Sequence, residues 1–236
     1  MESYQPPDVP GLEYRGADGE VIPYGDRWGM ESPPDETYSV TTHPERFAPL
    51  AEVARGLIAY LEHAYDVTVT ADLALAARVN HPRADAVAAV QIAPHGADAA
   101  TLTFVSSAFP SVYLEAGVAF SEHFPPCGCD ACDDSVEREA RRLEEVVFGV
   151  VAGGLVESVR RETNRVAGLP IPGRRGFAFS LATEGGSRSG WSLPSISEEA
   201  HMRAVRTRIE SRQGQPWAAW CPHEASTARG PNPQVD

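Results

Sequence analysis

The clearest hydrophobic pattern in the chain predicts a helix that begins near Pro44 and ends near Tyr65-Asp66. Apolar residues recur there three or four positions apart, which places them on one face of a helix. Proline is favoured in the first helical turn, and Thr42 or His43 can cap that turn. The residues of the apolar face are Phe47, Leu50, Val53, Ala54, Leu57, Ile58 and Leu61.

A second helical stripe follows Asp133 or Asp134, either of which can cap it, and fades at residues 164–168. Three glycines interrupt this stripe, and each costs about 1 kcal/mol relative to alanine inside a helix. We therefore expect another backbone to pack closely against these glycines. The apolar positions are Val136, Ala140, Leu143, Val147, Val150, Leu155 and Val159, and the glycines are Gly149, Gly153 and Gly154.

Between the two helices the pattern changes to short apolar runs separated by turn residues. A short strand at 67–69 and a short helix at 72–79 are followed by strand-like runs at 86–93, 99–107 and 111–120. Short connections cannot accommodate parallel crossovers, so these runs predict an antiparallel meander.

The pattern after the second helix predicts one more strand and one more helix. Residues 177–181 form the predicted strand, between a connector at 170–173 and a flexible loop at 185–190. The last helix is predicted to start at Ser195 or Ser197 and to continue to about Arg212.

These elements divide the chain into three parts. Residues 1–41 form an irregular arm rich in proline, glycine and aromatic residues, with a short hairpin expected around Asp18-Gly19. Residues 42–212 form a single α+β domain, in which an antiparallel β meander packs against two main helices. Residues 213–236 form a mostly disordered tail, with the segment 217–223 as the exception.

The charge of the chain limits its partners. Its 236 residues carry a formal net charge of −13, and all 20 basic residues are arginine. An acidic surface repels nucleic acid and anionic membranes, whereas a basic protein is a suitable partner. The absence of lysine excludes Schiff-base catalysis and a P-loop lysine.

The N-terminal residues and the hydrophobicity profile indicate a cytoplasmic protein. The segment that begins Met1-Glu2-Ser3 has no basic region followed by an apolar one, as a signal peptide requires. No apolar run reaches the ~18–20 residues of a membrane helix. In a reducing compartment cysteines remain thiols or bind metals.

The candidate chemistry lies in a cluster of three cysteines within six residues, Cys127, Cys129 and Cys132. Thiolates this close together suit a tetrahedral zinc ion with a structural role. The fourth ligand must then come from His123, Cys221 or His223. An unmetallated cluster of reduced thiols is an equally good interpretation of the same residues, because only one C-x-x-C pair is present.

An enzyme is the competing class. Thiols near a helix N-terminus have a lowered pKa and can act as nucleophiles, but the sequence establishes no base beside them. His43-Pro44-Glu45 matches the H-x-E element of zinc deaminases. The second deaminase element does not fit, because Asp130 stands where its second cysteine belongs. We therefore favour a non-enzymatic binding or interaction protein.

Three segments together resemble DUF6226, an actinobacterial family of domains of unknown function. They are the runs at 21–29 (VIPYGDRWG), 43–50 (HPERFAPL) and 127–133 (CGCDACD). The resemblance covers roughly residues 12–212, and Asp134 replaces the glutamate that the family usually has after the cluster. It implies a single α+β domain and no particular chemistry.

Overall fold

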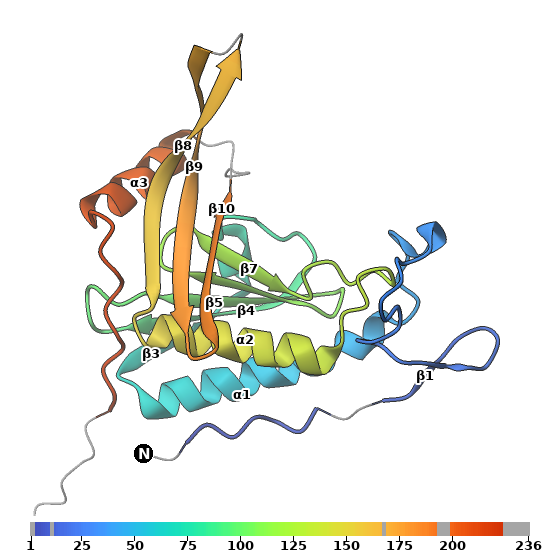
Figure 1. Cartoon of the computed structure of the whole chain (residues 1–236). Helices are drawn as coiled ribbons and strands as arrows, with labels where there is room; N and C mark the ends of the chain where they lie inside the picture. Colours follow the sequence, from blue (N-terminus) through green and yellow to red (C-terminus); the bar gives the residue numbers. More distant parts are fainter. Residues whose placement is uncertain (1–2, 10–11, 167–168, 193–198, 224–236) are drawn as a thin grey trace, which may run out of the picture.

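The computed structural model of the chain describes residues 3–9, 12–166, 169–192 and 199–223 (Figure 1). Within these ranges the chain forms a five-stranded antiparallel sheet, a three-stranded antiparallel sheet and three α-helices, together with short 3₁₀ turns and a small hairpin. The predicted α+β class is confirmed. No helix in the described ranges is long and apolar enough to cross a membrane.

The large sheet is the predicted meander, with strands in the order β3-β4-β5-β6-β7. The third predicted run is two strands rather than one, because Gly117 adopts a φ of +63° and turns the chain between them. The short helix predicted at 72–79 is the 3₁₀ turn η3 (Leu73–Ala77). The strands are β3 (Val67–Ala71), β4 (Ala86–Pro94), β5 (Leu102–Ser107), β6 (Val112–Ala116) and β7 (Phe120–Phe124).

Two helices, α1 (Pro49–Ala64) and α2 (Val136–Val151), lie side by side and cover one face of this sheet (Figure 1). They provide the main core, because their apolar stripes and the inward strand residues bury one another. The fully buried side chains include Leu50, Leu57, Leu61, Leu102, Leu114, Phe120, Phe124 and Leu143. The arrangement predicted from the two stripes is confirmed.

The first helix begins later than predicted. Residues Pro44–Phe47 form the 3₁₀ turn η2, and α1 starts at Pro49, with no side-chain cap. Proline lacks the N–H that a helix interior needs, so Pro49 suits the first position of a helix better than its middle. The Thr42 side chain, predicted as a cap, instead hydrogen bonds to Asp130.

The second helix ends earlier than predicted and is capped by Ser135, whose hydroxyl accepts from the Arg138 N–H. It ends before Gly153, which has a φ of +81° and leaves no room for a side chain. A Cβ there would lie 2.8 Å from the Trp217 carbonyl oxygen. The expectation that another backbone packs closely against this glycine is therefore correct. The helix nevertheless ends before Gly153, and the chain continues as β8 (Leu155–Val166).

The second sheet has β9 (Leu169–Thr183) between β8 and β10 (Gly186–Ser192). The predicted connector at 170–173 was wrong, since it lies in β9, and the predicted loop at 185–190 was wrong from its second residue onward, since β10 begins at Gly186. Prolines are tolerated at 170–173 because this part of β9 pairs with β8 alone. Its other edge has no strand partner there among the described residues, so no N–H donor is needed on that side. Helix α3 (Glu199–Ser211) packs on this sheet, and its predicted start at 195–197 lies outside the described residues.

Both terminal segments pack against the domain. The predicted hairpin is present as β1 (Tyr14–Arg15) and β2 (Val21–Ile22), and the Tyr4 ring lies 5.2 Å from that of Phe148 on α2. In the C-terminal segment Trp217 and Trp220 are only 2% and 4% exposed and belong to the main core. The Trp220 indole N–H donates to the Ala100 carbonyl at 2.9 Å.

Candidate functional site

The three clustered cysteines converge in space. The sulfur of Cys129 lies 3.2 Å from that of Cys127 and 3.5 Å from that of Cys132, and all three sulfurs lie within 4.8 Å of one another. Sulfurs bound to one tetrahedral zinc are about 3.8 Å apart, since each Zn–S bond is about 2.3 Å. Three corners of a metal site are therefore present in the cysteine loop, which we define as residues 126–134.

A glycine shapes the cysteine loop. Gly128 has a φ of +82°, and a Cβ at this position would lie 2.9 Å from the Phe109 ring. Only glycine satisfies both constraints. Its carbonyl oxygen accepts from the Thr41 hydroxyl at 3.1 Å and from the Arg46 guanidinium at 3.0 Å. The turn that directs Cys127 and Cys129 toward each other is thus held from two sides.

The Cys129 and Cys132 thiols differ in acidity. Burial raises the pKa of Cys129, but hydrogen bonds from Cys127 and from the backbone N–H groups of Cys132 and Ser39 outweigh it and bring the pKa to about 7. Burial and hydrogen bonds to the other two sulfurs raise the pKa of Cys132 to about 12. The cluster therefore accommodates one thiolate easily and resists further ionisation unless a cation compensates the charge.

A buried ionic network attaches the cysteine loop to the start of α1. The side chain of Arg46 is 2% exposed and stacks on the Tyr24 ring at 4.1 Å, and one of its nitrogens lies 3.9 Å from the Asp130 carboxylate. The same carboxylate accepts from the Thr42 N–H at 3.2 Å. Sequence inspection assigned no role to Arg46 or Asp130, although both lie within the family-like segments.

The N-terminal arm completes this network. The Trp28 indole N–H donates to the Asp130 carbonyl at 3.2 Å, and the Arg27 N–H donates to the Asp133 carboxylate at 2.7 Å. Arg27, Arg46 and the cysteine loop come from the three segments that resemble the family. The structure therefore brings those segments together at one place, which local spacing alone does not reveal.

His123 does not lie in the cluster. It belongs to β7, its ring stacks on that of Tyr113 at 5.4 Å, and its Nε2 lies 2.5 Å from the Pro126 carbonyl oxygen. One of its two ring nitrogens is therefore engaged with the backbone that leads into the cysteine loop.

Cys221 and His223 lie at the other end of the helix pair. The Cys221 carbonyl accepts from Asp66 and the His223 N–H donates to Ala64, both at the C-terminal end of α1. The cysteine loop contacts the chain just before α1, whose 16 residues span about 24 Å. The structure thus brings neither residue to the sulfurs, because the tail follows the far end of the domain.

His43, in the deaminase-like element, also lies outside the cysteine cluster. The two ring nitrogens of His43 lie 2.9 Å from the Glu45 carboxylate and 3.1 Å from the Arg15 carbonyl. Both positions that could bind a metal therefore have protein partners. The metal-ligating group that the described residues form consists of Cys127, Cys129 and Cys132.

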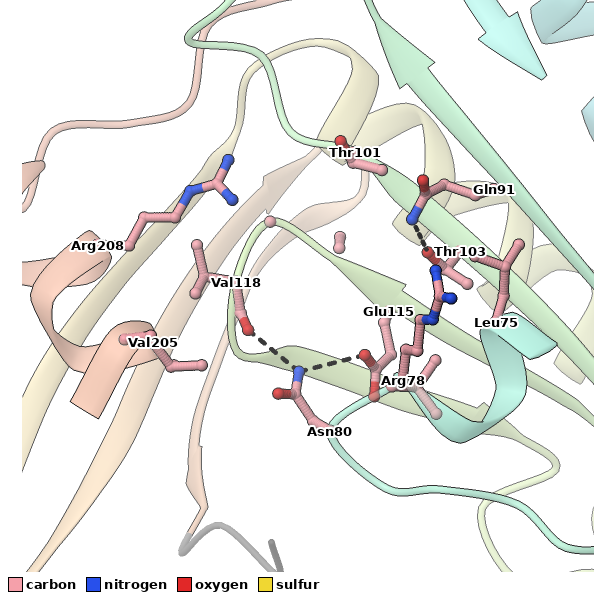
Figure 2. Close-up of a pocket in the computed structure, with 14 residues that line it drawn as sticks. Leu75, Arg78, Asn80, Gln91, Thr101, Thr103, Glu115, Val118, Val205 and Arg208 are labelled. Atoms are coloured by element: carbon pink, nitrogen blue, oxygen red, sulfur yellow. Dashed lines mark hydrogen bonds between the residues drawn. The ribbon is translucent and has the colours of Figure 1, made fainter. Parts of the chain in front are cut away.

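A separate cavity of about 490 Å³ lies on the face of the large sheet that α1 and α2 leave uncovered. Figure 2 shows side chains from η3, β4, β5, β6 and α3 around it. Cross-strand pairing aligns Gln91, Thr103 and Glu115 on the strands that form its base. This row of polar residues within the apolar runs is the sequence signal that could have revealed the cavity.

Glu115 is the acidic side chain that lines this cavity. Its carboxylate accepts from the Asn80 side chain at 3.2 Å and from the His81 N–H at 3.4 Å. Burial raises its pKa to about 7, and these hydrogen bonds only partly offset the effect. Glu115 faces away from the main core, and residues of η3 and α3 enclose that face of the sheet.

The fold and the cysteine loop define an α+β protein with a thiolate cluster that can hold a metal ion. The chain belongs to DUF6226, a family of unknown function, whose model matches residues 10–224. The match extends beyond the expected 12–212 and includes the segment with Trp217 and Trp220. No curated protein and no solved structure matches the chain.

Proposed function

We propose that the protein is a non-enzymatic, cytoplasmic interaction protein whose cysteine loop is held by a structural zinc ion. The observation that carries the proposal is the convergence of three sulfurs within 4.8 Å. Zinc prefers thiolates in a tetrahedral arrangement, and structural zinc sites use short loops of this kind. Reduced thiolates require a reducing compartment, which favours the cytoplasm.

The acidity of the cluster supports a bound dication. Without a cation, the Cys132 thiol loses its proton reluctantly, as its raised pKa shows. A divalent ion compensates the combined charge and makes the three-thiolate state favourable near neutral pH. The N–H groups of Ser39 and Cys132 already hydrogen bond to the Cys129 sulfur and would orient it as a ligand.

A structural role suits the position of the loop. The cysteine loop connects β7 to α2 and contacts the N-terminal arm through Trp28 and Thr41. An ion there would bring together segments about 100 residues apart, such as Trp28 and Asp130. Among the described residues three sulfurs form the ligand set, so water or a ligand from elsewhere takes the fourth position in this proposal.

The partner that we propose is a basic protein. The net charge of −13 favours association with a positively charged surface and disfavours nucleic acid. An enzyme that uses thiol or zinc chemistry at the cysteine loop is the alternative. It gains support from the Cys129 pKa of about 7, which gives a substantial thiolate fraction at neutral pH.

Metal analysis of protein purified under reducing conditions tests the zinc site. We expect one zinc per chain in the wild type and loss of zinc in Cys129→Ser. The matched control is Cys221→Ser, which should retain the metal because Cys221 lies at the far end of α1. A wild-type protein that remains free of zinc after incubation with the ion would refute the proposal.

The coordination sphere separates the structural from the catalytic interpretation. X-ray absorption at the zinc edge should give three sulfur ligands, and removal of zinc should lower the melting temperature. For an enzyme, added small thiols or hydroxamates should displace the fourth ligand and change the spectrum. If such ligands exchange freely while zinc removal leaves stability unchanged, the structural role is wrong and the catalytic alternative is favoured.

A further inference from the structure

The cavity beneath α3 contains two arginines that the fold leaves without an acidic partner. Arg78 follows η3 and Arg208 lies on α3, and both line the cavity. In the part of the chain that the structure describes, neither guanidinium has an ion pair or a hydrogen bond. Figure 2 shows the two groups on opposite sides of the space.

Both arginines are exposed, and they lack the ion pairs that several other arginines of the described chain form. Acidic residues outnumber basic ones, 33 to 20, and other arginines, such as Arg142 and Arg188, form ion pairs with Glu122. Two guanidinium groups at one cavity create a local positive potential on a protein of net charge −13. Arginine is also the side chain best suited to carboxylate and phosphate, since its planar N–H groups match their oxygens.

The base of the cavity offers hydrogen-bonding groups at fixed positions. The Gln91 amide donates to the Thr103 hydroxyl at 3.3 Å, and the Asn80 amide joins the Glu115 carboxylate to the Val118 carbonyl. Strand residues are held more rigidly than loop residues, so these groups form a pre-arranged polar surface. Apolar side chains complete the wall, namely Leu75, Val79, Val118 and Val205.

We propose that this cavity binds a small organic anion, whose carboxylate or phosphate group lies between Arg78 and Arg208. The polar part of the ligand hydrogen bonds to Gln91, Thr103 and Glu115. A volume of about 490 Å³ is in the range of cavities that enclose metabolite-sized ligands. The two arginines carry two positive charges, and Glu115 offsets one of them only when it is ionised, so the cavity keeps a net positive charge that favours an anion.

This inference is independent of the zinc site. The cavity opens on the sheet face away from α1 and α2, and its lining residues include none of the cysteines. If the protein does not bind zinc, the proposal of an anion site is unaffected. If it does not bind an anion, the proposal of a zinc site is unaffected.

Titration of the full chain with inorganic phosphate and with succinate tests the proposal. Amide and arginine side-chain N–H resonances report the contact, and we expect saturable shifts at Arg78, Arg208 and Thr103. Saturation by succinate alone indicates a carboxylate ligand, and saturation by phosphate alone indicates a phosphate ester. Shifts that stay linear for both probes up to tens of millimolar would overturn the proposal.

Charge-removing variants locate the site. Arg78→Gln and Arg208→Gln should each weaken binding about tenfold, the usual effect of losing a charged hydrogen bond. Arg55→Gln removes the same charge from an exposed ion pair with Glu52 on α1 and should change the affinity less than twofold. Equal affinity in all three variants would show that the anion binds elsewhere and that the assignment is wrong.

Discussion

The Trp217 indole N–H donates a 2.9 Å hydrogen bond to the carboxylate of Glu157 inside the domain. Glu157 is 2% exposed, and the same carboxylate accepts from the backbone N–H groups of Val118, Ala119 and Phe120. One buried side chain on β8 therefore joins the turn between β6 and β7 to the C-terminal segment. Val118 also lines the anion cavity, so this carboxylate stabilises one wall of that site.

Removing the indole donor should destabilise the whole domain. In Trp217→Phe the buried carboxylate loses one hydrogen bond, and bonds to charged groups contribute about 1.5–3 kcal/mol. We expect the free energy of unfolding in urea to fall by about 2 kcal/mol. The control is Trp191→Phe on β10, where the side chain is 44% exposed and the expected change is below about 0.5 kcal/mol. Equal stability of the two variants would contradict the anchoring role of Trp217.

Stability should depend on pH through Glu115. Its pKa rises from 4.5 to about 7 on folding, chiefly because of burial. The folded state then holds a proton that the unfolded state releases, so this residue lowers stability as pH rises from 4.5 to 7. At 1.36 kcal/mol per pKa unit the loss is about 3 kcal/mol. Glu115→Gln should remove this component, making the variant more stable than the wild type at pH 8 and not at pH 4.

Chemical denaturation of both proteins across this pH range measures the effect. The two curves of unfolding free energy should separate above pH 5 and stay parallel above pH 8. Curves that remain parallel throughout would show that Glu115 has an ordinary pKa in the folded protein.

Loss of the buried guanidinium at Arg46 should be severe. Arg46→Met keeps the apolar part of the side chain but leaves the Gly128 carbonyl without this donor. It also removes a positive charge that partly neutralises the Asp130 carboxylate. Breaking a buried charge pair costs about 3–5 kcal/mol. We expect a loss of that size in thermal unfolding, whereas Arg55→Met, on the exposed face of α1, should have little effect. A small change in Arg46→Met would mean that the network does not hold the cysteine loop.

A substitution at the end of α2 tests how closely the C-terminal segment approaches Gly153. Gly153→Ala places a methyl group 2.8 Å from main-chain atoms of the C-terminal segment and forces alanine to a φ of +81°. Both effects destabilise, and we expect a loss of more than 2 kcal/mol. The matched change Gly96→Ala meets only Ala99 at 3.8 Å and should be tolerated. Similar melting temperatures for the two variants would contradict the close approach at Gly153.

The parts of the fold that sequence predicts are those determined by local periodicity. The stripe from Leu50 to Leu61 identifies a helix and its buried face, and the apolar runs between turn residues identify the strands β4 to β6. The end of α2 is different, because Leu155 and Val159 fit a helical stripe and an alternating strand equally well. The contact of Gly153 with Trp217, more than 60 residues later, decides between the two.

The two candidate sites differ in the same respect, because one depends on local spacing and the other on contacts between distant segments. Cys127, Cys129 and Cys132 converge because a single turn connects them, so their spacing is informative. The fourth ligand is not predictable from the sequence, and Cys221 was a poor candidate because the tail packs along the far end of α1. Arg208 and Arg78 line one cavity only because α3 lies close to the uncovered face of the large sheet, and no local pattern predicts that contact.

The burial of Trp217 and Trp220 has a consequence for synthesis in the cell. The interior of the domain lacks both indole rings until residue 220 has left the ribosome. A nascent chain that carries all five meander strands and both large helices therefore still has an incomplete core, and the apolar surface near Ala100 stays uncovered until Trp220 packs against it.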